Sequence, residues 1–233
     1  MTGNYFLDAL EPSDRDAVLR IVKPVDLADG DVIIHQDAKV ATVHFPIRAQ
    51  LSNITTASDG YQLETSIIGK EGLSGLAPFM ASAACAWQVV CIVGGAALAA
   101  QADDLRALSD KRPGLHRRLL TLTHFYQAQA NQLALCNTHH RATPRLARWL
   151  LTTSDLAEVN GLRITQEQIA RALGVQRTSI VEAFAHLKAE GLIRHGRSRL
   201  ELLDRPGLIR RACDCYSQLH SLALEQRILP RNP

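Results

Sequence analysis

The sequence lacks any uninterrupted run of 18 apolar residues, so no membrane-spanning helix is expected. Its first residues, MTGNYFLDALEPSDRD, have no basic segment followed by an apolar run, and this argues against a secretory signal. Cysteine is sparse, with 5 in 233 residues, and an odd number in a long chain fits a reducing compartment better than a disulfide framework. We therefore expect a cytoplasmic protein with no membrane partner.

Motifs of the common enzyme classes are also missing. The chain contains no G-x-S-x-G, no H-E-x-x-H, no Walker loop and no G-x-G-x-x-G. Cys85 or Cys91 could serve as a reactive thiol, but apolar neighbours would raise the thiol pKa and make it inert. We therefore predict that the protein is not an enzyme.

Charge is distributed unevenly along the chain. Residues 141–233 hold 15 Arg and Lys against 9 Asp and Glu, a net of +6, whereas residues 1–140 carry a net of −3. A basic C-terminal part suits a polyanionic partner such as nucleic acid, and the alternative is a solvated basic surface. The length and the 46% hydrophobic composition are sufficient for two domains.

Residues 164–187, ITQEQIARALGVQRTSIVEAFAHL, predict two short helices joined by a tight turn. Ile169 and Leu173 are one helical turn apart, and Gly174 permits the left-handed backbone that such a turn requires. Thr165 and Gln168 have the spacing of a capping box, and Gly191 would end the second helix. The pattern is typical of a helix-turn-helix, whose second helix enters the DNA major groove; the alternative is an ordinary helical hairpin.

Polar residues remain on the outer face at the start of the second helix, where a recognition helix presents its side chains to base edges. The predicted base-reading residues are Gln176, Arg177, Thr178, Ser179 and Glu182. Short apolar runs on either side of residues 195–198 predict a β-hairpin, or wing, with a basic tip that lies along phosphates. The predicted phosphate contacts are Thr165, Lys188, His195, Arg197 and Arg199.

The rest of the chain divides into two parts. Residues 5–22 predict one short helix ended by Pro24, and residues 25–100 show short β-type runs separated by turns, typical of a sandwich or barrel. A short helix is expected at 102–108, with Ser109 and Asp110 starting the next. Another is predicted after a break near Thr143 and Pro144, and LIRRACDCYSQLHSLALEQ is predicted to form one terminal helix.

A long helix is predicted from about residue 113 to 137, with apolar or semi-apolar residues at spacings of four and three. This stripe could pack on the chain's own β domain or on a second copy. Because a helix-turn-helix that reads a two-fold site requires a dimer, we assign it to a homodimer seam. The stripe comprises Leu115, Leu119, Leu122, Tyr126, Gln129, Leu133 and Cys136.

The order of these parts resembles the Crp/Fnr superfamily of bacterial transcription regulators over nearly the whole chain. The resemblance is most specific in RLARWLL, in TQEQIARALGVQRTSIVEAFAHLKAEGLIR and in GDVIIHQ, while DRPGLIRRACDCY is similar to a subgroup whose effector is unknown. It implies an α+β protein with a cyclic-nucleotide-binding-like β-roll (jelly roll) sensor at 1–108, a dimerisation helix and hinge at 109–140, and a winged helix-turn-helix DNA-binding domain at 141–233. The implied partners are double-stranded DNA and a second copy, with RNA polymerase as a further candidate.

The effector pocket departs from that of the cyclic-nucleotide-binding members. Those members hold the cyclic phosphate with an Arg–Ser pair behind a glycine-rich turn. Here Glu71, Gly72 and Gly75 are similar to the turn, but Ala84 and Cys85 stand where the pair is expected. Neither supplies a cation for a phosphate, and Arg48 or Lys70 could substitute only from elsewhere in the fold. Cyclic nucleotide binding is therefore disfavoured.

Other cofactors receive little support from the sequence. The iron–sulfur members use an N-terminal cysteine cluster, and this chain has no cysteine before Cys85. Cys213 and Cys215 in one helix would point apart, and His139 and His140 are expected to face solvent or phosphate at the hinge, so no metal site is predicted. A haem held by His35, His44, Cys85 or Cys91 remains an alternative, as does another small effector.

In the recognition helix the resemblance places base reading at Arg177, Thr178 and Glu182. The last position is often Arg in the family, so the operator is expected to differ in sequence while keeping its two-fold symmetry. An effector-independent regulator, and a winged-helix module that binds another protein, are the alternative functions.

Overall fold

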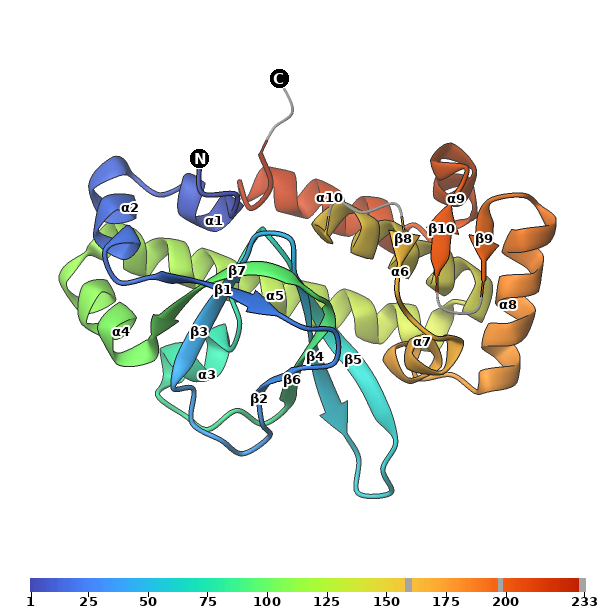
Figure 1. Ribbon diagram of the computed structural model, residues 1–233, viewed down its shortest axis with the longest axis horizontal. Coiled ribbons are helices and arrows are strands. Elements are labelled where there is room, and N and C mark those ends of the chain that lie inside the picture. Colours follow the sequence, from blue (N-terminus) through green and yellow to red (C-terminus); the bar gives the residue numbers. More distant parts are fainter. Residues whose placement is uncertain (158–160, 197–198, 231–233) are drawn as a thin grey trace.

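Two antiparallel sheets and a long helix behind them form the N-terminal half of the computed structural model, which describes residues 1–157, 161–196 and 199–230 (Figure 1). One sheet has the order β1-β7-β3 and the other β2-β6-β4-β5. The strands are β1 (Lys23–Leu27), β2 (Val32–Ile34), β3 (Thr42–Pro46), β4 (Gln50–Thr56), β5 (Gln62–Ile68), β6 (Gln88–Val93) and β7 (Gly95–Gln101). The fold is the predicted α+β β-roll.

Two of these strands have sequences that disfavour strand structure. Pro24, expected to end a helix, lies inside β1, which is tolerated because β1 is an edge strand that pairs only with β7. Strand β7 has the sequence GAALAAQ, and alanine and glycine favour strands poorly. It forms because it lies between β1 and β3 and pairs with both, so tertiary pairing overrides local preference.

The N-terminal helices also differ from the prediction. Residues 5–22 form two helices rather than one, α1 (Tyr5–Asp8) and α2 (Pro12–Leu19), and Asn4 caps the first by accepting from the Leu7 amide. Helix α3 is Leu76–Ala81 and α4 is Ala102–Lys111. Ser109 and Asp110 therefore end α4 instead of starting the next helix.

The long helix α5 (Pro113–His139) has its predicted stripe turned toward its own chain. Leu115, Leu119 and Leu122 are fully buried in a core with Phe45 and Leu76. Gln129 accepts hydrogen bonds from the Ser66 hydroxyl at 2.5 Å and from the Ile67 amide at 2.7 Å. The assignment of this stripe to a homodimer seam is therefore wrong, because residues buried within one chain cannot contact another.

The C-terminal half is a winged helix-turn-helix with a helical extension. Helix α6 starts at Ala142, so Pro144 lies in its first turn, where proline is tolerated, and the expected break is at residues 140–141 instead. The wing has a third strand, β8, beside the two that the sequence predicts. The elements are α6 (Ala142–Ala157), β8 (Gly161–Leu162), α7 (Gln166–Leu173), α8 (Arg177–Ala189), β9 (Ile193–His195), β10 (Leu200–Leu202), α9 (Arg205–Arg211) and α10 (Cys215–Glu225).

The predicted single terminal helix is broken. Helix α9 ends at Arg211, and α10 begins at Cys215 and runs beside α5 (Figure 1). Ala223 and Ile228 join the core that contains Phe6 and Leu115. Among the described residues, no helix has the length and hydropathy that a membrane span requires.

Candidate nucleic-acid interface

The helix-turn-helix forms as its local sequence predicts. The Thr165 hydroxyl accepts from the Gln168 amide at 3.2 Å, and the Gln168 side chain accepts from the Thr165 amide at 2.8 Å, which completes a capping box. Gly174 ends α7 with φ 56°, a left-handed conformation that glycine adopts at little cost. Ile169, Ile180 and their neighbours are buried against Trp149 of α6, so α8 is held from behind and its outer face is free.

Helix α8 lies at one end of the molecule, away from the β-roll (Figure 1). The predicted base-reading residues Gln176, Arg177, Thr178 and Glu182 are exposed there, and Ser179 is half-buried. Gln176, the N-cap residue, makes no side-chain capping bond, so the first amides of α8 keep their capacity to bind an anion. The exposed face of α8 therefore presents hydrogen-bond donors and acceptors together with the positive, N-terminal end of the helix dipole.

The predicted phosphate residues surround this face but are not equivalent. Lys188 and Arg199 are exposed, and Arg199 lies 3.3 Å from Glu201, which also pairs with Arg194. His195 is half-buried and its ring lies 4.9 Å from that of Phe184. Burial, followed by the charge of Lys188, lowers the His195 pKa, so His195 is neutral at pH 7 and offers a hydrogen bond rather than a charge. Arg197 lies outside the described residues.

A hairpin of the β-roll docks on the turn of the helix-turn-helix, a contact that sequence reasoning missed. The Tyr61 hydroxyl donates a hydrogen bond of 2.7 Å to the Gly174 carbonyl. A Cβ added at Gly174 would lie 2.3 Å from the Tyr61 hydroxyl and 2.6 Å from Leu63 Cδ1. The N-terminal domain therefore touches the turn that aims the recognition helix.

A second contact between the two halves is buried and polar. Glu64 of β5 accepts hydrogen bonds from the Ser52 hydroxyl at 2.5 Å and from the Trp149 indole nitrogen of α6 at 3.0 Å. Burial raises the Glu64 pKa to about 7, although these hydrogen bonds and the charge of Arg148 oppose the increase. A carboxyl group whose pKa is near neutral thus lies between the β-roll and α6, the helix that packs behind α8.

The residues predicted for a degenerate effector pocket do not form a shared site. Glu71 folds back on its own loop and accepts from the Gly69 amide at 2.9 Å, and burial raises its pKa to about 7. Gly72 packs under Tyr126, and Gly75 precedes α3 in the left-handed conformation. Cys85 is buried in an apolar cluster, whereas Ala84 is exposed. Of these residues only Glu71 lines the larger of the two cavities described next.

Two cavities lie behind the β-roll. One of about 170 Å³, between β5 and α5, includes Asn53, Trp87 and Tyr126 in its lining and has no charged group among its described lining residues. The other, of about 590 Å³, lies between the β-roll, α5, α6 and α10 and includes Lys70, Arg205 and Tyr216. Ligand pockets measure roughly 300–1,000 Å³, so only the second has the size for a nucleotide-sized molecule.

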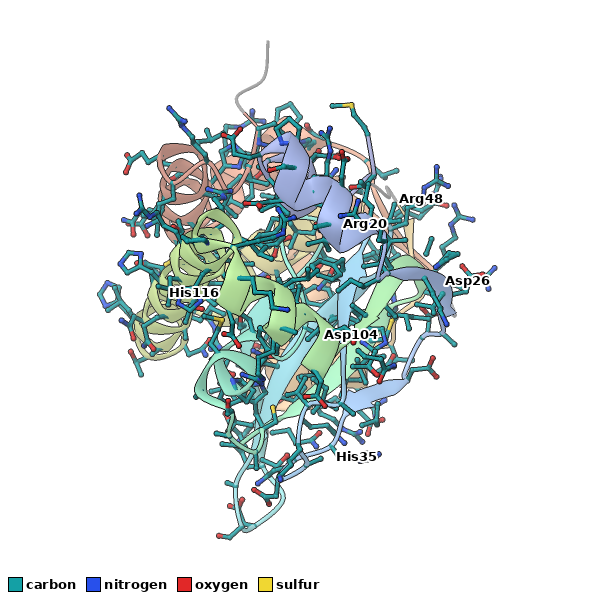
Figure 2. All side chains as sticks on the ribbon, turned by 90° about the vertical axis from the view of Figure 1, so that its left-hand side faces the viewer. Arg20, Asp26, His35, Arg48, Asp104 and His116 are labelled. Atoms are coloured by element: carbon teal, nitrogen blue, oxygen red, sulfur yellow. The ribbon has the colours of Figure 1, made fainter. Side chains whose placement is uncertain are left out.

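The other candidate ligands of the β domain are dispersed. Arg48 is exposed on the opposite side of the molecule from His116 of α5, and His35 is exposed near the lower edge (Figure 2). His44 is half-buried with its Nδ1 3.4 Å from the Ser74 hydroxyl. Cys91 is buried, and desolvation raises its pKa to about 12. Arg48 is therefore not placed to act on the pocket behind the β-roll.

Comparison with known proteins agrees with this architecture. The family model of the Crp-like helix-turn-helix domain matches residues 144–211. The transcriptional regulatory protein btr of Bordetella pertussis is 26% identical over 156 residues, which cover 64% of this chain and 62% of that protein's length.

Solved structures show the same fold at low identity. FixK2 from Bradyrhizobium japonicum superposes with a TM-score of 0.67 at 16% identity, over 83% of this chain and 98% of that one. A regulator of the crp/fnr family from Eubacterium rectale gives a TM-score of 0.69 at 16% identity, over 91% and 99%.

The family match and the structural superpositions agree on a β-roll, a long helix and a C-terminal Crp-like helix-turn-helix domain. Over most of its length the chain has the fold of these structures, whose proteins include a regulator of the crp/fnr family.

Proposed function

We propose that this protein regulates transcription by binding a two-fold symmetric operator in double-stranded DNA as a homodimer, under the control of its β-roll. The observation that carries the proposal is the open polar face of α8, held from behind by a buried core and bounded by exposed basic residues. We place this protein in the cytoplasm, where its DNA partner is located. A contact with RNA polymerase would use a different surface from the one that binds DNA.

Base reading is proposed for the start of α8. Arg177 can donate two hydrogen bonds to guanine O6 and N7, and Glu182 can accept from cytosine N4. In the part of the chain that the structure describes, neither residue forms an ion pair, so both are free for bases. Gln176, Thr178 and Ser179 complete the reading face.

Phosphate binding is proposed for Lys188, Arg199 and Thr165, together with Arg197 and His195 of the wing. These contacts set position and supply the sequence-independent, salt-dependent part of the affinity. Since His195 is uncharged at neutral pH, Lys188 and Arg199 are the main described cations.

The homodimer is proposed to form along the outer face of α5. That face carries a second stripe at spacings of three and four, and Leu120 and Leu135 are 50% and 54% exposed there. The stripe comprises Arg117, Leu120, His124, Gln127, Asn131, Ala134 and Thr138, all exposed, and the exposed Leu135 lies beside it. Two chains joined at this stripe would present two recognition helices to neighbouring half-sites.

Control by the β-roll is proposed to pass through its contacts with the reader. The Tyr61–Gly174 hydrogen bond joins the β4–β5 hairpin to the turn after α7, and the Glu64–Trp149 hydrogen bond joins β5 to α6. A movement of this hairpin would therefore change the orientation of α8. The cavity of about 590 Å³ touches both halves and is the place where a small effector would bind with different affinity in two states. The smaller cavity has neither the size for a nucleotide nor a charged group among its described lining residues.

The test is selection of genomic DNA fragments by the purified full-length protein without added ligand. A two-fold motif with half-sites about one helical turn apart would support operator binding by a dimer without an obligatory effector. Recovery of background sequences only, together with no loss of DNA retention as salt increases, would reject DNA binding and favour a protein-interaction module. Recovery of background with steep salt dependence would indicate that an effector is required.

A further inference from the structure

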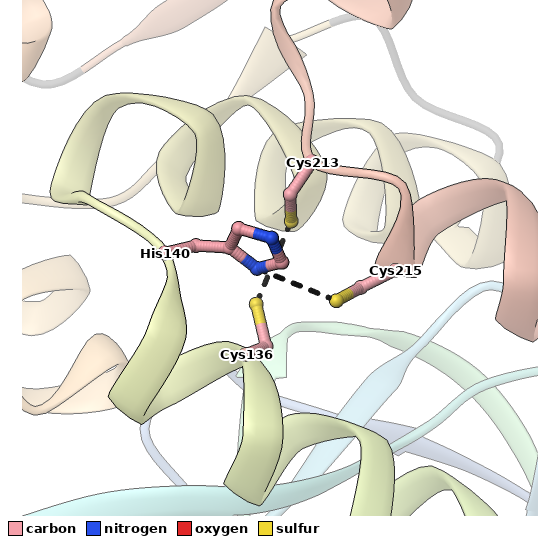
Figure 3. A group of neighbouring side chains, drawn as sticks. All are labelled: Cys136, His140, Cys213 and Cys215. Carbon is pink, nitrogen blue, oxygen red and sulfur yellow. Dashed lines mark hydrogen bonds between the residues drawn. The ribbon is translucent and has the colours of Figure 1, made fainter.

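Four side chains with metal-binding atoms converge where α5 ends and α10 begins (Figure 3). They are Cys136, His140, Cys213 and Cys215, and their thiol sulfurs and imidazole nitrogen all lie within 4.8 Å of one another. All three cysteines are buried, and His140 is half-buried. None of these residues belongs to the DNA-facing surface or to the two cavities behind the β-roll.

Local structure explains how the four meet. Cys136 and His140 are four residues apart at the end of α5, so they share one face of the helix. Cys213 and Cys215 would point apart inside a helix, but the chain is extended at Ala212, and Cys213 precedes α10 while Cys215 starts it. The break between α9 and α10 therefore turns both sulfurs toward the end of α5.

The distances fit one tetrahedral ion. Cys136 Sγ lies 3.5 Å from Cys213 Sγ, and Cys215 Sγ lies 3.6 Å from His140 Nδ1. In a tetrahedron with Zn–S near 2.3 Å and Zn–N near 2.0 Å, two ligand atoms are about 3.5–3.8 Å apart. Ligands of an iron–sulfur cluster bind different iron atoms and would be farther apart, so the spacing favours a single ion.

Neighbouring groups are placed as outer contacts of such a site. The second ring nitrogen of His140, Nε2, lies 3.5 Å from Asp214 Oδ1, which leaves Nδ1 to face the sulfurs. The Gln132 side-chain amide donates to Cys215 Sγ at 3.1 Å. A carboxylate behind a histidine ligand and an amide donor to a thiolate are the contacts that orient ligands in metal sites.

The local charge also suits a thiolate-rich site. Three thiolates, a neutral imidazole and a divalent ion carry a net charge of −1. Arg148 is 2% exposed, and its Nε and Nη1 have no hydrogen-bond partner among the described atoms. Its positive charge acts on both Cys136 and Cys213. A buried guanidinium is thus available to balance the anionic site.

We propose that Cys136, His140, Cys213 and Cys215 bind one zinc ion in a closed Cys₃His site that fastens α10 to the end of α5. Three cysteines and one histidine with no open position are the ligand set of a structural zinc site. The ion would hold α10 against the hinge that leads from α5 into α6. The proposal does not depend on DNA binding.

The test uses the full chain, produced without a polyhistidine tag and kept reduced. Metal analysis is expected to find one zinc per chain after exchange against a weak chelator. Cobalt added to the zinc-free protein should produce thiolate-to-cobalt charge-transfer absorption and the intense visible bands of a tetrahedral site. Zinc should protect Cys136, Cys213 and Cys215 from a thiol reagent and leave Cys85 and Cys91 unaffected.

Matched variants locate the site. C136S, C213S and C215S should each lose the stoichiometric zinc, and H140Q should bind it many times more weakly. C85S and C91S also remove buried thiols, but in the β-roll, and should keep full zinc content. Circular dichroism shows which variants remain folded, and the cobalt spectrum of the wild type needs no variant at all.

Three results would overturn the proposal. One is a folded, reduced wild type that binds no zinc or cobalt in the presence of the chelator. The second is purification with iron and inorganic sulfide in place of zinc. The third is a stable Cys136–Cys213 disulfide in protein that retains its folded state and excludes metal.

Discussion

Trp149 Nε1 donates a hydrogen bond of 3.0 Å to Glu64 Oε1, and this bond joins the β-roll to the helix behind the DNA reader. Both side chains are buried. The acceptor is a carboxyl group whose pKa is raised to about 7 by burial, so the junction between the two halves changes its charge near neutral pH.

Replacement of Glu64 should change how stability depends on pH. The folded protein binds the Glu64 proton more tightly than the unfolded chain does, because the pKa is about 7 in the fold and near 4.5 in the unfolded chain. Stability therefore falls as pH rises from 4.5 to 7, by about 3 kcal/mol for this group. E64Q, which can still accept from Trp149, should lose less stability over that range in urea unfolding at several pH values. Substitution of the exposed Glu225 serves as control, and parallel curves for E64Q and wild type would contradict the assignment.

Two glycines with the same backbone conformation should differ in their tolerance of alanine. Gly174 has φ +56° and faces Tyr61 and Leu63, whereas Gly191 has φ +70° with nothing within 4 Å of an added Cβ. G191A should cost only the left-handed backbone penalty of about 1–2 kcal/mol. G174A should lower stability more than G191A does, as measured by thermal unfolding. In a Y61A/L63A background the two glycine substitutions should lower stability by the same amount. Equal costs would show that the hairpin does not pack on the turn.

Arg177 and Lys188 should affect DNA binding in different ways. R177A is expected to weaken binding to the selected operator by about 1–3 kcal/mol and to relax one base position. K188A should weaken binding to all sequences alike and flatten the dependence of affinity on salt, because it removes one phosphate contact. Titrations of operator and scrambled DNA at several salt concentrations distinguish the two. An unchanged selected motif for R177A would remove Arg177 from the readout.

The outer stripe of α5 should control the oligomeric state. L120E and L135E place charges on the proposed seam and should give monomers in light scattering, with weaker operator binding. L203E is the matched control, since Leu203 is 52% exposed but lies outside α5. A dimer that persists in both α5 variants would place the interface elsewhere.

Local sequence patterns predicted the helix-turn-helix well, but they predicted poorly how distant segments pack together. The capping box of Thr165 and Gln168 and the left-handed Gly174 are set by residues close in sequence, and both are found in the structure. The stripe of α5 correctly indicated a buried face. The spacing of the stripe does not indicate which surface covers that face. In the structure the chain's own β-roll covers it.

The cysteine cluster could not be predicted for the same reason. Cys136 and Cys213 are far apart in sequence, and Cys213 and Cys215 were placed in one helix because no proline or glycine interrupts RRACDCY. The interruption comes from packing, as Cys213 donates its amide to the Pro144 carbonyl of α6. The sequence did contain one indication of a metal site, a C-x-C pair together with a C-x-x-x-H pair elsewhere in the chain.

The core that contains Phe6, Leu115, Ala223 and Ile228 joins segments from near both ends of the chain. During synthesis the β-roll strands leave the ribosome long before residues 223–228, so this core stays incomplete until the reader domain has been made. Folding of the N-terminal half is thereby coupled to completion of the C-terminal half. A chain cut short after the wing would leave apolar surface uncovered on α5 and become a substrate for chaperones or proteases rather than a competing, half-active regulator.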